Sequence, residues 1–201
     1  MIRVLLAEDQ AMVRGALAAL LRMEEDIEVV AEVARGNEVE MAALKTQPDV
    51  ALLDIEMPGL DGLSVARALH ESLPSCRIVI LTTFGRSGYL RQAMESGAVG
   101  FLLKDAPAAG LAEAIRRVME GERVVDPELA LSALSDGSNP LTPREQDVLR
   151  ASLEGASIAG MAARLFISEG TVRNHLSTAI QKMNARNRVE AARLAEEKGW
   201  L

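Results

Sequence analysis

The chain of 201 residues contains 49% hydrophobic and 25% charged residues, which is typical of a globular protein. Its length suggests one or two domains and is sufficient to bury a core. The single cysteine, Cys76, excludes an intrachain disulfide and a cysteine-based zinc site, and we expect it to be an inert, partly buried thiol. The N-terminal run reaches acidic residues too soon for a signal peptide, and no apolar run could span a bilayer. The sequence therefore predicts a cytoplasmic protein with no membrane partner.

The net charge of −7 is unevenly distributed along the chain. Residues 1–134 carry 13 basic and 21 acidic side chains, whereas residues 135–201 carry nine basic and eight acidic ones. Within residues 168–193 the basic side chains exceed the acidic ones by three. This asymmetry points weakly to an anionic partner for the C-terminal part.

The first part of the chain alternates between short apolar runs and amphipathic helical patterns. Five strand-like runs separated by helical segments predict an open, parallel α/β sheet with right-handed crossovers. The strand-like runs are residues 2–7, 28–34, 50–53, 78–81 and 100–103. Apolar residues recur on one helical face at Val13, Ala16, Leu17, Leu20 and Leu21, at Leu63, Ala66, Leu69 and Leu73, and at Leu111, Ala114, Ile115 and Val118.

A charged residue ends the most apolar of these runs. In VALLDIEMPG, residues 50–59, the run finishes on Asp54 and the chain then turns at Pro58-Gly59. A parallel sheet binds its ligands at the carboxyl ends of its strands. The other strands end at Glu8-Asp9, at Thr82 and at Lys104, so we expect all these groups on one rim of the sheet.

Three carboxylates that share one rim repel one another and need a cation. Oxygen ligands of this kind suit Mg²⁺, which keeps several waters and binds phosphate oxygens. Lys104 and the Thr82 hydroxyl complement a bound phosphoryl group, which makes Asp54 a candidate carboxylate nucleophile. Taken singly, each residue has a plainer interpretation: Asp54 as a loop carboxylate, Glu8-Asp9 as acids at a helix N-terminus, and Lys104 as a solvated lysine.

Residues 1–121 resemble the receiver domain of bacterial response regulators. The matching motifs are AED at 7–9, LLDIEMPGLDG at 52–62, ILTTF at 80–84 and GFLLKD at 100–105. The resemblance implies a flavodoxin-like sheet with strand order 2-1-3-4-5. It also implies that Asp54 accepts phosphate from a sensor histidine kinase and that the protein is not an enzyme.

The resemblance assigns further roles around Asp54. Glu8, Asp9 and Asp54 would bind Mg²⁺ together with the main-chain carbonyl of Glu56. Thr82 would hydrogen-bond the phosphoryl group, and Lys104 would pair with it. Phe101 would act as a switch aromatic that rotates inward, although a core aromatic is an equally good interpretation. The chain has Glu-Asp where the family commonly has Asp-Asp, and this pair should still bind the metal.

The C-terminal part has no strand signal after the polar stretch SDGSNP at 135–140, which we interpret as part of a linker over residues 122–140. Thr142, Pro143 and Glu145 form the sequence pattern of a capping box at a helix start. Gly155 should end this helix, and Ser157 and Ser168 should cap the next two. A fourth helix closes the chain, so residues 141–201 should form an all-α domain.

The second and third of these helices have the form of a helix-turn-helix. The third helix would place its N-terminal residues in the major groove of double-stranded DNA. Arg173 suits guanine, Asn174 suits adenine and Ser177 suits either base. Thr171, His175 and Lys182 are better placed for phosphates.

Residues 140–201 resemble the LuxR-type DNA-binding domain through LTPREQDVL, AARLFISEGTVRNHL and RNRVEAARLAEEKGWL. Together the two parts resemble NarL/FixJ-type response regulators, in particular the DesR-like group. The resemblance implies a transcription regulator that dimerises on phosphorylation, through helices near 13–21 and 111–118, and binds inverted half-sites in promoters. One departure is IAGM at 158–161, where the family usually has polar and charged residues. Gly160 in this stretch weakens a helix by about 1 kcal/mol relative to Ala.

Two alternatives remain open. A phosphatase of the haloacid-dehalogenase type also uses an aspartyl phosphate, but it places a second Asp two residues after the nucleophile, where this chain has Glu56. A regulator that binds DNA constitutively, without phosphate, is the other alternative, and the complete set of Asp54, Thr82 and Lys104 argues against it.

Overall fold

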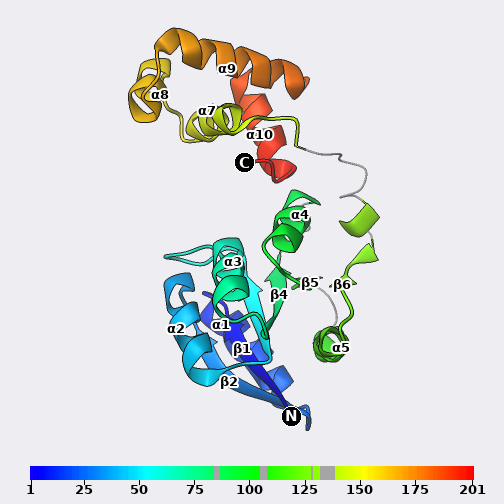
Figure 1. Ribbon diagram of the computed structural model, residues 1–201. Helices are drawn as coiled ribbons and strands as arrows, with labels where there is room; N and C mark the ends of the chain where they lie inside the picture. Colours follow the sequence, from blue (N-terminus) through cyan, green and yellow to red (C-terminus); the bar gives the residue numbers. More distant parts are fainter. Residues whose placement is uncertain (84–86, 105–107, 128, 132–138) are drawn as a thin grey trace. The chain divides into compact units, whose positions relative to one another are not determined.

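The computed structural model describes residues 1–83, 87–104, 108–127, 129–131 and 139–201 (Figure 1). Phe84 and Asp105 of the sequence motifs and residues 132–138 of the predicted linker lie outside this set. The chain divides into two compact units, residues 1–85 with 90–130, and residues 86–89 with 131–201. Among the described residues no helix is both long enough and apolar enough to cross a membrane.

The first unit is built on a six-stranded sheet in which every neighbouring pair of strands is parallel. The strand order is β2-β1-β3-β4-β5-β6, which contains the predicted order 2-1-3-4-5. The strands are β1 (Ile2–Ala7), β2 (Ile27–Val33), β3 (Val50–Asp54), β4 (Arg77–Thr82), β5 (Gly100–Leu103) and β6 (Val124–Val125). The helices between them are α1 (Ala11–Leu21), α2 (Gly36–Thr46), α3 (Gly62–Ser72), α4 (Ser87–Glu95) and α5 (Ala108–Met119).

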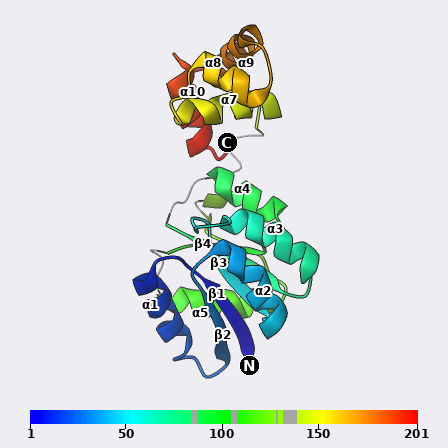
Figure 2. The same cartoon turned by 90° about the vertical axis from the view of Figure 1, so that its left-hand side faces the viewer.

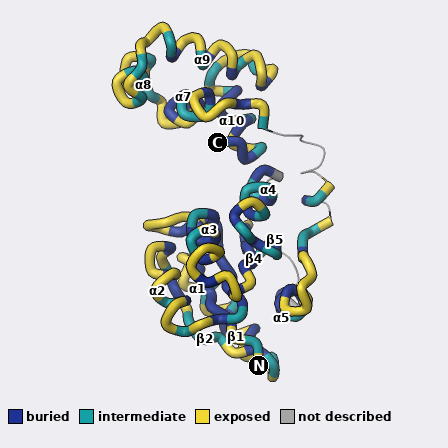
Figure 3. Tube along the Cα trace, viewed as in Figure 1, coloured by how far each residue is buried: buried dark blue, intermediate teal, exposed yellow. Residues whose placement is uncertain are grey.

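Both faces of the sheet are covered by helices. Figure 2 shows α1 and α5 on one face and α2, α3 and α4 on the other. All five residues of β3 are therefore buried, which explains its unbroken apolar sequence (Figure 3). Alternate residues of the strands, such as Val4 and Leu6, join a core cluster with Leu21 of α1 and Ile115 of α5.

The sixth strand corrects the predicted count of five. Val124 and Val125 pair with Gly100 and Phe101 of β5, and the Val124 N–H donates to Val99 O at 3.0 Å. These residues lie in the segment predicted as a linker. A strand of two residues is too short to show the alternating pattern by which strands are recognised. The boundary of the first domain at residue 121 stays a prediction.

The second unit contains four helices in residues 141–201: α7 (Pro143–Leu153), α8 (Ile158–Leu165), α9 (Glu169–Lys182) and α10 (Arg188–Glu197). The predicted caps are confirmed. The Glu145 N–H donates to Thr142 Oγ1 while the Glu145 carboxylate accepts from the Thr142 N–H, which completes a capping box. Ser157 caps α8, and Ser168 caps α9. Gly155 follows α7 in the left-handed region, with φ of 76°.

These helices surround a core of their own. Val148, Met161, Val172 and Ala191 come from four different helices, and each is fully buried. Trp200 packs into the same cluster and is 9% exposed, as expected for an anchor of the last helix. A compact core of this kind fixes the angle at which α9 lies on its neighbours.

We predict that Cys76 is unreactive in the folded protein. The residue is 5% exposed, and burial raises the pKa of its thiol to about 12, so almost no thiolate forms at neutral pH. A disulfide reagent such as DTNB should label the native protein at least about 100-fold more slowly than an unfolded chain. Absorbance at neutral pH, with and without guanidinium, measures the two rates. Equal rates would show that the start of β4 is not packed as described.

Candidate functional site

Three carboxylates and one lysine meet at the carboxyl ends of the strands. Oxygen atoms of Glu8, Asp9 and Asp54 lie within 4.8 Å of one another. Lys104 Nζ lies 2.6 Å from Glu8 Oε2 and 2.9 Å from Asp54 Oδ2. We call these four residues the acidic site. The rim predicted from the strand ends is therefore formed.

The lysine in this site is a buried counter-ion. The side chains of Lys104, Glu8 and Asp54 are only 7%, 1% and 5% exposed. Burial raises the pKa of the Glu8 carboxyl, and the nearby charge of Asp54 raises it further, while Lys104 opposes both effects. Burial alone would lower the pKa of Lys104, but its hydrogen bonds to Glu8 and Asp54 outweigh this effect and raise it. The lysine thus stays charged and holds the two carboxylates together.

The loop after Asp54 is positioned by close backbone contacts. The Gly62 N–H donates to Ile55 O at 2.9 Å, and a Cβ on Gly62 would lie only 1.9 Å from Asp54 O. Gly59 turns the chain at a φ of 91°, beside Asn37. The N–H of Gly36, at the start of α2, donates to Pro58 O at 3.1 Å. The turn that presents Asp54 is therefore fixed from two sides.

The loop that carries the other two acids has a brace that the sequence did not reveal. Arg14 of α1 donates through Nη1 to Glu8 O at 2.6 Å and to Asp9 O at 3.3 Å. The Gln10 N–H also donates to Glu8 Oε1 at 3.2 Å. Main-chain acceptors carry no sequence signature, so spacing alone could not assign this role to Arg14.

The remaining predicted residues lie where the strand ends place them. Thr82 ends β4 and is 2% exposed, and its carbonyl accepts from the Lys104 N–H at 2.8 Å. Phe101 of β5 is fully buried, beside Ile80 in the register of the sheet. The Glu56 side chain is exposed, two residues beyond Asp54. The roles of these residues in phosphate and metal binding stay predictions.

The donor set of the acidic site fits a divalent cation. It offers carboxylate oxygens and no nitrogen or sulfur, as Mg²⁺ prefers. Asp9 is exposed whereas Glu8 and Asp54 are buried, so one ligand faces solvent. Because Lys104 already pairs with Glu8 and Asp54, a bound cation would share two of its carboxylate residues with the lysine.

The polar residues of α9 fall on two sides of the helix. Arg173, Asn174 and Ser177 are exposed, as expected for a surface that contacts DNA bases. Thr171 and His175 are half-buried. Arg173 Nη2 pairs with Glu169 Oε2 at 2.8 Å, but its side chain remains 59% exposed and can exchange this partner for another acceptor.

Lys182, predicted to contact phosphate, has a partner within its own domain. Its Nζ donates to Glu145 Oε1 at 3.0 Å and to Oε2 at 2.8 Å. Burial alone would raise the pKa of Glu145, but the bonds from Lys182 and from the Thr142 N–H lower it instead. The sequence identified Glu145 only as a capping residue, because its second partner lies 37 residues away.

Models of two protein families match the chain. A response regulator receiver domain matches residues 4–116, and the luxR family of bacterial regulatory proteins matches residues 139–195. The chain is a two-component response regulator with a LuxR-family DNA-binding domain. The receiver match places the acidic site within the receiver domain.

Two transcriptional regulatory proteins align with this protein over the entire chain. It is 48% identical to the transcriptional regulatory protein YvfU and 46% identical to the transcriptional regulatory protein DesR, both of Bacillus subtilis strain 168, over all of each chain. The predicted NarL/FixJ-type, DesR-like resemblance is thus confirmed. These relatives are transcriptional regulators, which agrees with the prediction that this protein is not an enzyme.

Solved structures support the same architecture. Response regulator ChrA of a heme-sensing two-component system is 36% identical, with a TM-score of 0.59 over 100% of this chain and 98% of that one. RcsB, solved in complex with DNA, has a TM-score of 0.70 over 98% of both chains, and its 24% identity supports the fold alone.

We predict that Gly62→Ala distorts the receiver at Asp54. The added Cβ meets a backbone carbonyl that cannot move without shifting the loop, so unfolding free energy should fall by about 1–3 kcal/mol. Gly15→Ala is the matched control, because no atom lies within 4 Å of its added Cβ and it removes a helical glycine. The control should gain up to about 1 kcal/mol. Urea denaturation measures both changes, and equal effects would contradict the contact.

Proposed function

We propose that the protein is switched by Mg²⁺-dependent phosphorylation of Asp54 and then binds promoter DNA as a dimer. The observation that carries this proposal is the position of Lys104, whose Nζ pairs with the buried carboxylates of Glu8 and Asp54 at the strand ends. A structural salt bridge has no need of a third carboxylate beside it. Asp9 adds one, and it faces solvent.

The chemistry assigned to the site is phosphoryl transfer from a sensor histidine kinase. Asp54 Oδ attacks phosphorus, the phosphorus–nitrogen bond of the kinase phosphohistidine breaks, and the departing imidazole nitrogen keeps the electron pair and takes up a proton. Glu8, Asp9, Asp54 and the main-chain carbonyl of Glu56 would hold Mg²⁺, which when bound would stabilise the negative charge of the phosphoryl oxygens. Lys104 then pairs with the phosphoryl group and the Thr82 hydroxyl donates to it.

Phosphorylation changes what Lys104 binds, and this is the proposed switch. The lysine exchanges a carboxylate partner for phosphoryl oxygens, while Thr82 moves toward the same group. Thr82 ends β4 and Lys104 directly follows the neighbouring strand β5, so their movement shifts the balance between two receiver conformations. Phe101 lies in β5, three residues before Lys104, and its ring takes part in the same change.

The LuxR-family domain is proposed to read DNA through α9. Arg173 pairs with guanine, Asn174 pairs with adenine, and Ser177 bonds either base in the major groove. Thr171 and His175 contact phosphates. The exposure of Arg173, Asn174 and Ser177 supports this assignment. A two-fold dimer would require inverted half-sites.

The predicted cytoplasmic location stays a prediction.

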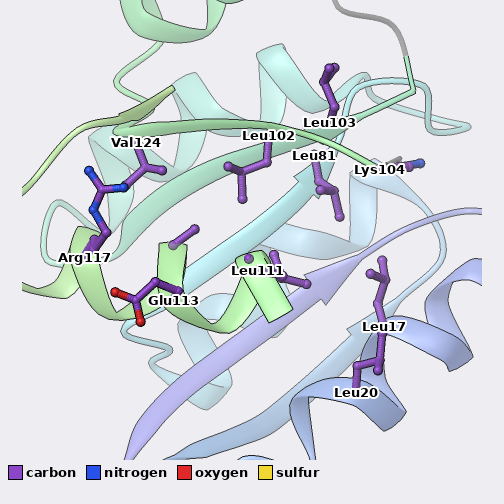
Figure 4. A pocket seen from close by; sticks show the side chains of 12 residues that line it. Leu17, Leu20, Leu81, Leu102, Leu103, Lys104, Leu111, Glu113, Arg117 and Val124 are labelled. Atoms are coloured by element: carbon purple, nitrogen blue, oxygen red, sulfur yellow. The ribbon is translucent and has the colours of Figure 1, made fainter. Parts of the chain in front are cut away.

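The proposed dimer surface consists of α1 and α5. The outer side of α1 exposes Met12, Gly15, Ala16, Ala19 and Leu20, with no charged residue among them. Beside it, a pocket of about 310 Å³ opens between α1, the ends of β4 and β5, and α5 (Figure 4). Leucines dominate its lining. An uncharged helix face next to an apolar pocket suits contact with a second copy of the chain.

We predict that Asp54→Asn abolishes phosphorylation and leaves the fold intact. With acetyl phosphate and Mg²⁺, the wild-type chain should take up one phosphoryl group and bind DNA more tightly, whereas the variant should do neither. EDTA should have the same effect on the wild type. Intact mass and DNA titration measure the two outcomes.

Glu56→Gln is the matched control, because only the main-chain oxygen of Glu56 is assigned a role. This variant should retain phosphate uptake. Stoichiometric uptake by Asp54→Asn would refute the assignment of Asp54. Equal DNA binding by the phosphorylated and unphosphorylated wild type would favour the constitutive regulator.

We predict that Ala16→Glu prevents dimerisation of the phosphorylated protein. The substitution places a charge in the middle of the uncharged α1 face, where two-fold symmetry would bring two such charges together. Leu44→Glu is the control, because it makes a similar change at a 48% exposed position on α2. Sedimentation velocity should find a dimer for the wild type and the control and a monomer for Ala16→Glu. A dimer for all three would exclude this surface.

A further inference from the structure

One ion pair joins the end of the recognition helix to the start of another helix. Lys182 is the last residue of α9, and Glu145 is the third residue of α7. The lysine donates to both carboxylate oxygens, at 2.8 and 3.0 Å. The Glu145 side chain is 4% exposed, so its charge is taken out of water and depends on the partners it has in the fold.

The carboxylate also serves the backbone of α7. Glu145 Oε2 accepts from the Thr142 N–H at 2.7 Å, while the Glu145 N–H donates to Thr142 Oγ1. The capping box restrains the orientation of Glu145 from within α7, independently of Lys182. The flexible side chain of Lys182 therefore pairs with a carboxylate whose orientation is restrained. The attraction between the two charges then forms only when Lys182 lies at one position relative to α7.

Around α9, Lys182 lies opposite Arg173 and on the same side as Thr171 and His175. Lys182 follows Arg173 by nine residues, which is about two and a half turns of an α-helix, so the two side chains leave opposite sides of the helix. The contact face of α9 with the core includes the buried residues Val172, Leu176 and Ala179, and Ile180 packs against the same cluster. These side chains set the distance and the crossing angle of α9 on its neighbours. The pair of Lys182 with Glu145 adds a directional contact at the C-terminal end of the helix.

We propose that Lys182 is a positioning residue for DNA recognition: through Glu145 it fixes the rotation of α9 on α7, and thereby the direction in which Arg173, Asn174 and Ser177 point. This role replaces the phosphate contact that the sequence suggested. In Figure 1, α9 lies across the domain beside α7, so the pair joins two neighbouring helices. The inference rests on the proposed DNA contacts of α9.

The decisive variant is Lys182→Met, which keeps the length of the side chain and removes its charge. Binding is measured on a duplex obtained by binding-site selection with the phosphorylated wild-type protein, and on a duplex of scrambled sequence. For Lys182→Met we expect the dissociation constant for the selected duplex to rise roughly tenfold, a typical coupling between sites. The scrambled duplex should be bound almost as before, and the salt dependence should not change.

A phosphate contact predicts a different outcome for the same variant. Both duplexes would lose affinity equally, and the slope of log K against log salt would fall by about one. That result overturns the proposal. Lys45→Met removes the same charge from α2 of the receiver and controls for net charge. Failure of the wild type itself to select any duplex would count against the DNA contacts of α9 and not against the positioning role.

Stability must be separated from positioning, because Lys182→Met leaves the buried charge of Glu145 unpaired. The double variant Glu145→Gln with Lys182→Met removes both charges and should fold. It should bind the selected duplex no more weakly than either single variant, since both residues act through one pair. Lys182→Arg should restore tight binding. Additive losses, or normal affinity in a variant that shows only a lower melting temperature, overturn the proposal.

Discussion

The receiver depends on keeping buried charge at the end of its sheet. The side chains of Glu8 and Asp54 are only 1% and 5% exposed, and among the ion pairs of the described residues it is Lys104 that neutralises them. Buried carboxylates without such a partner would be strongly destabilising. The lysine therefore stabilises the fold by neutralising these carboxylates. Lys104 is also the side chain that is proposed to change partner on phosphorylation. The stability of the unphosphorylated receiver and its proposed switch thus depend on the same ammonium group.

A second lysine plays a comparable part in the LuxR-family domain, with a different result. Lys104 lies between two carboxylates that a cation could also bind, so its partners can change. Lys182 faces one carboxylate that the Thr142 capping box already holds, so its partner is fixed. An ion pair whose partners can change suits a conformational switch. An ion pair whose partner is fixed suits the positioning of one helix on another. The difference lies in the neighbours and not in the lysines.

Most of the fold followed from sequence patterns with strong physical causes. Short, mainly apolar runs identified five of the strands. Thr142, Ser157 and Ser168 marked helix starts because their side chains satisfy free backbone N–H groups. The rim of Glu8, Asp9, Asp54 and Lys104 followed because parallel strands end at one edge. What the sequence could not provide were contacts made by the main chain or between distant residues. The brace of Arg14, the close approach of Gly62 to Asp54 and the pair of Glu145 with Lys182 are all of this kind.

The sixth strand links the acidic site to the chain that follows the receiver domain. Val125 is the register partner of Phe101, and β6 is continuous with the chain that runs on toward the LuxR-family domain. β5 ends one residue before Lys104, so a displacement of β5 pulls on β6 through their shared hydrogen bonds. A displacement that follows the proposed phosphorylation of Asp54 would thus have a route along the edge of the sheet that does not pass through α5.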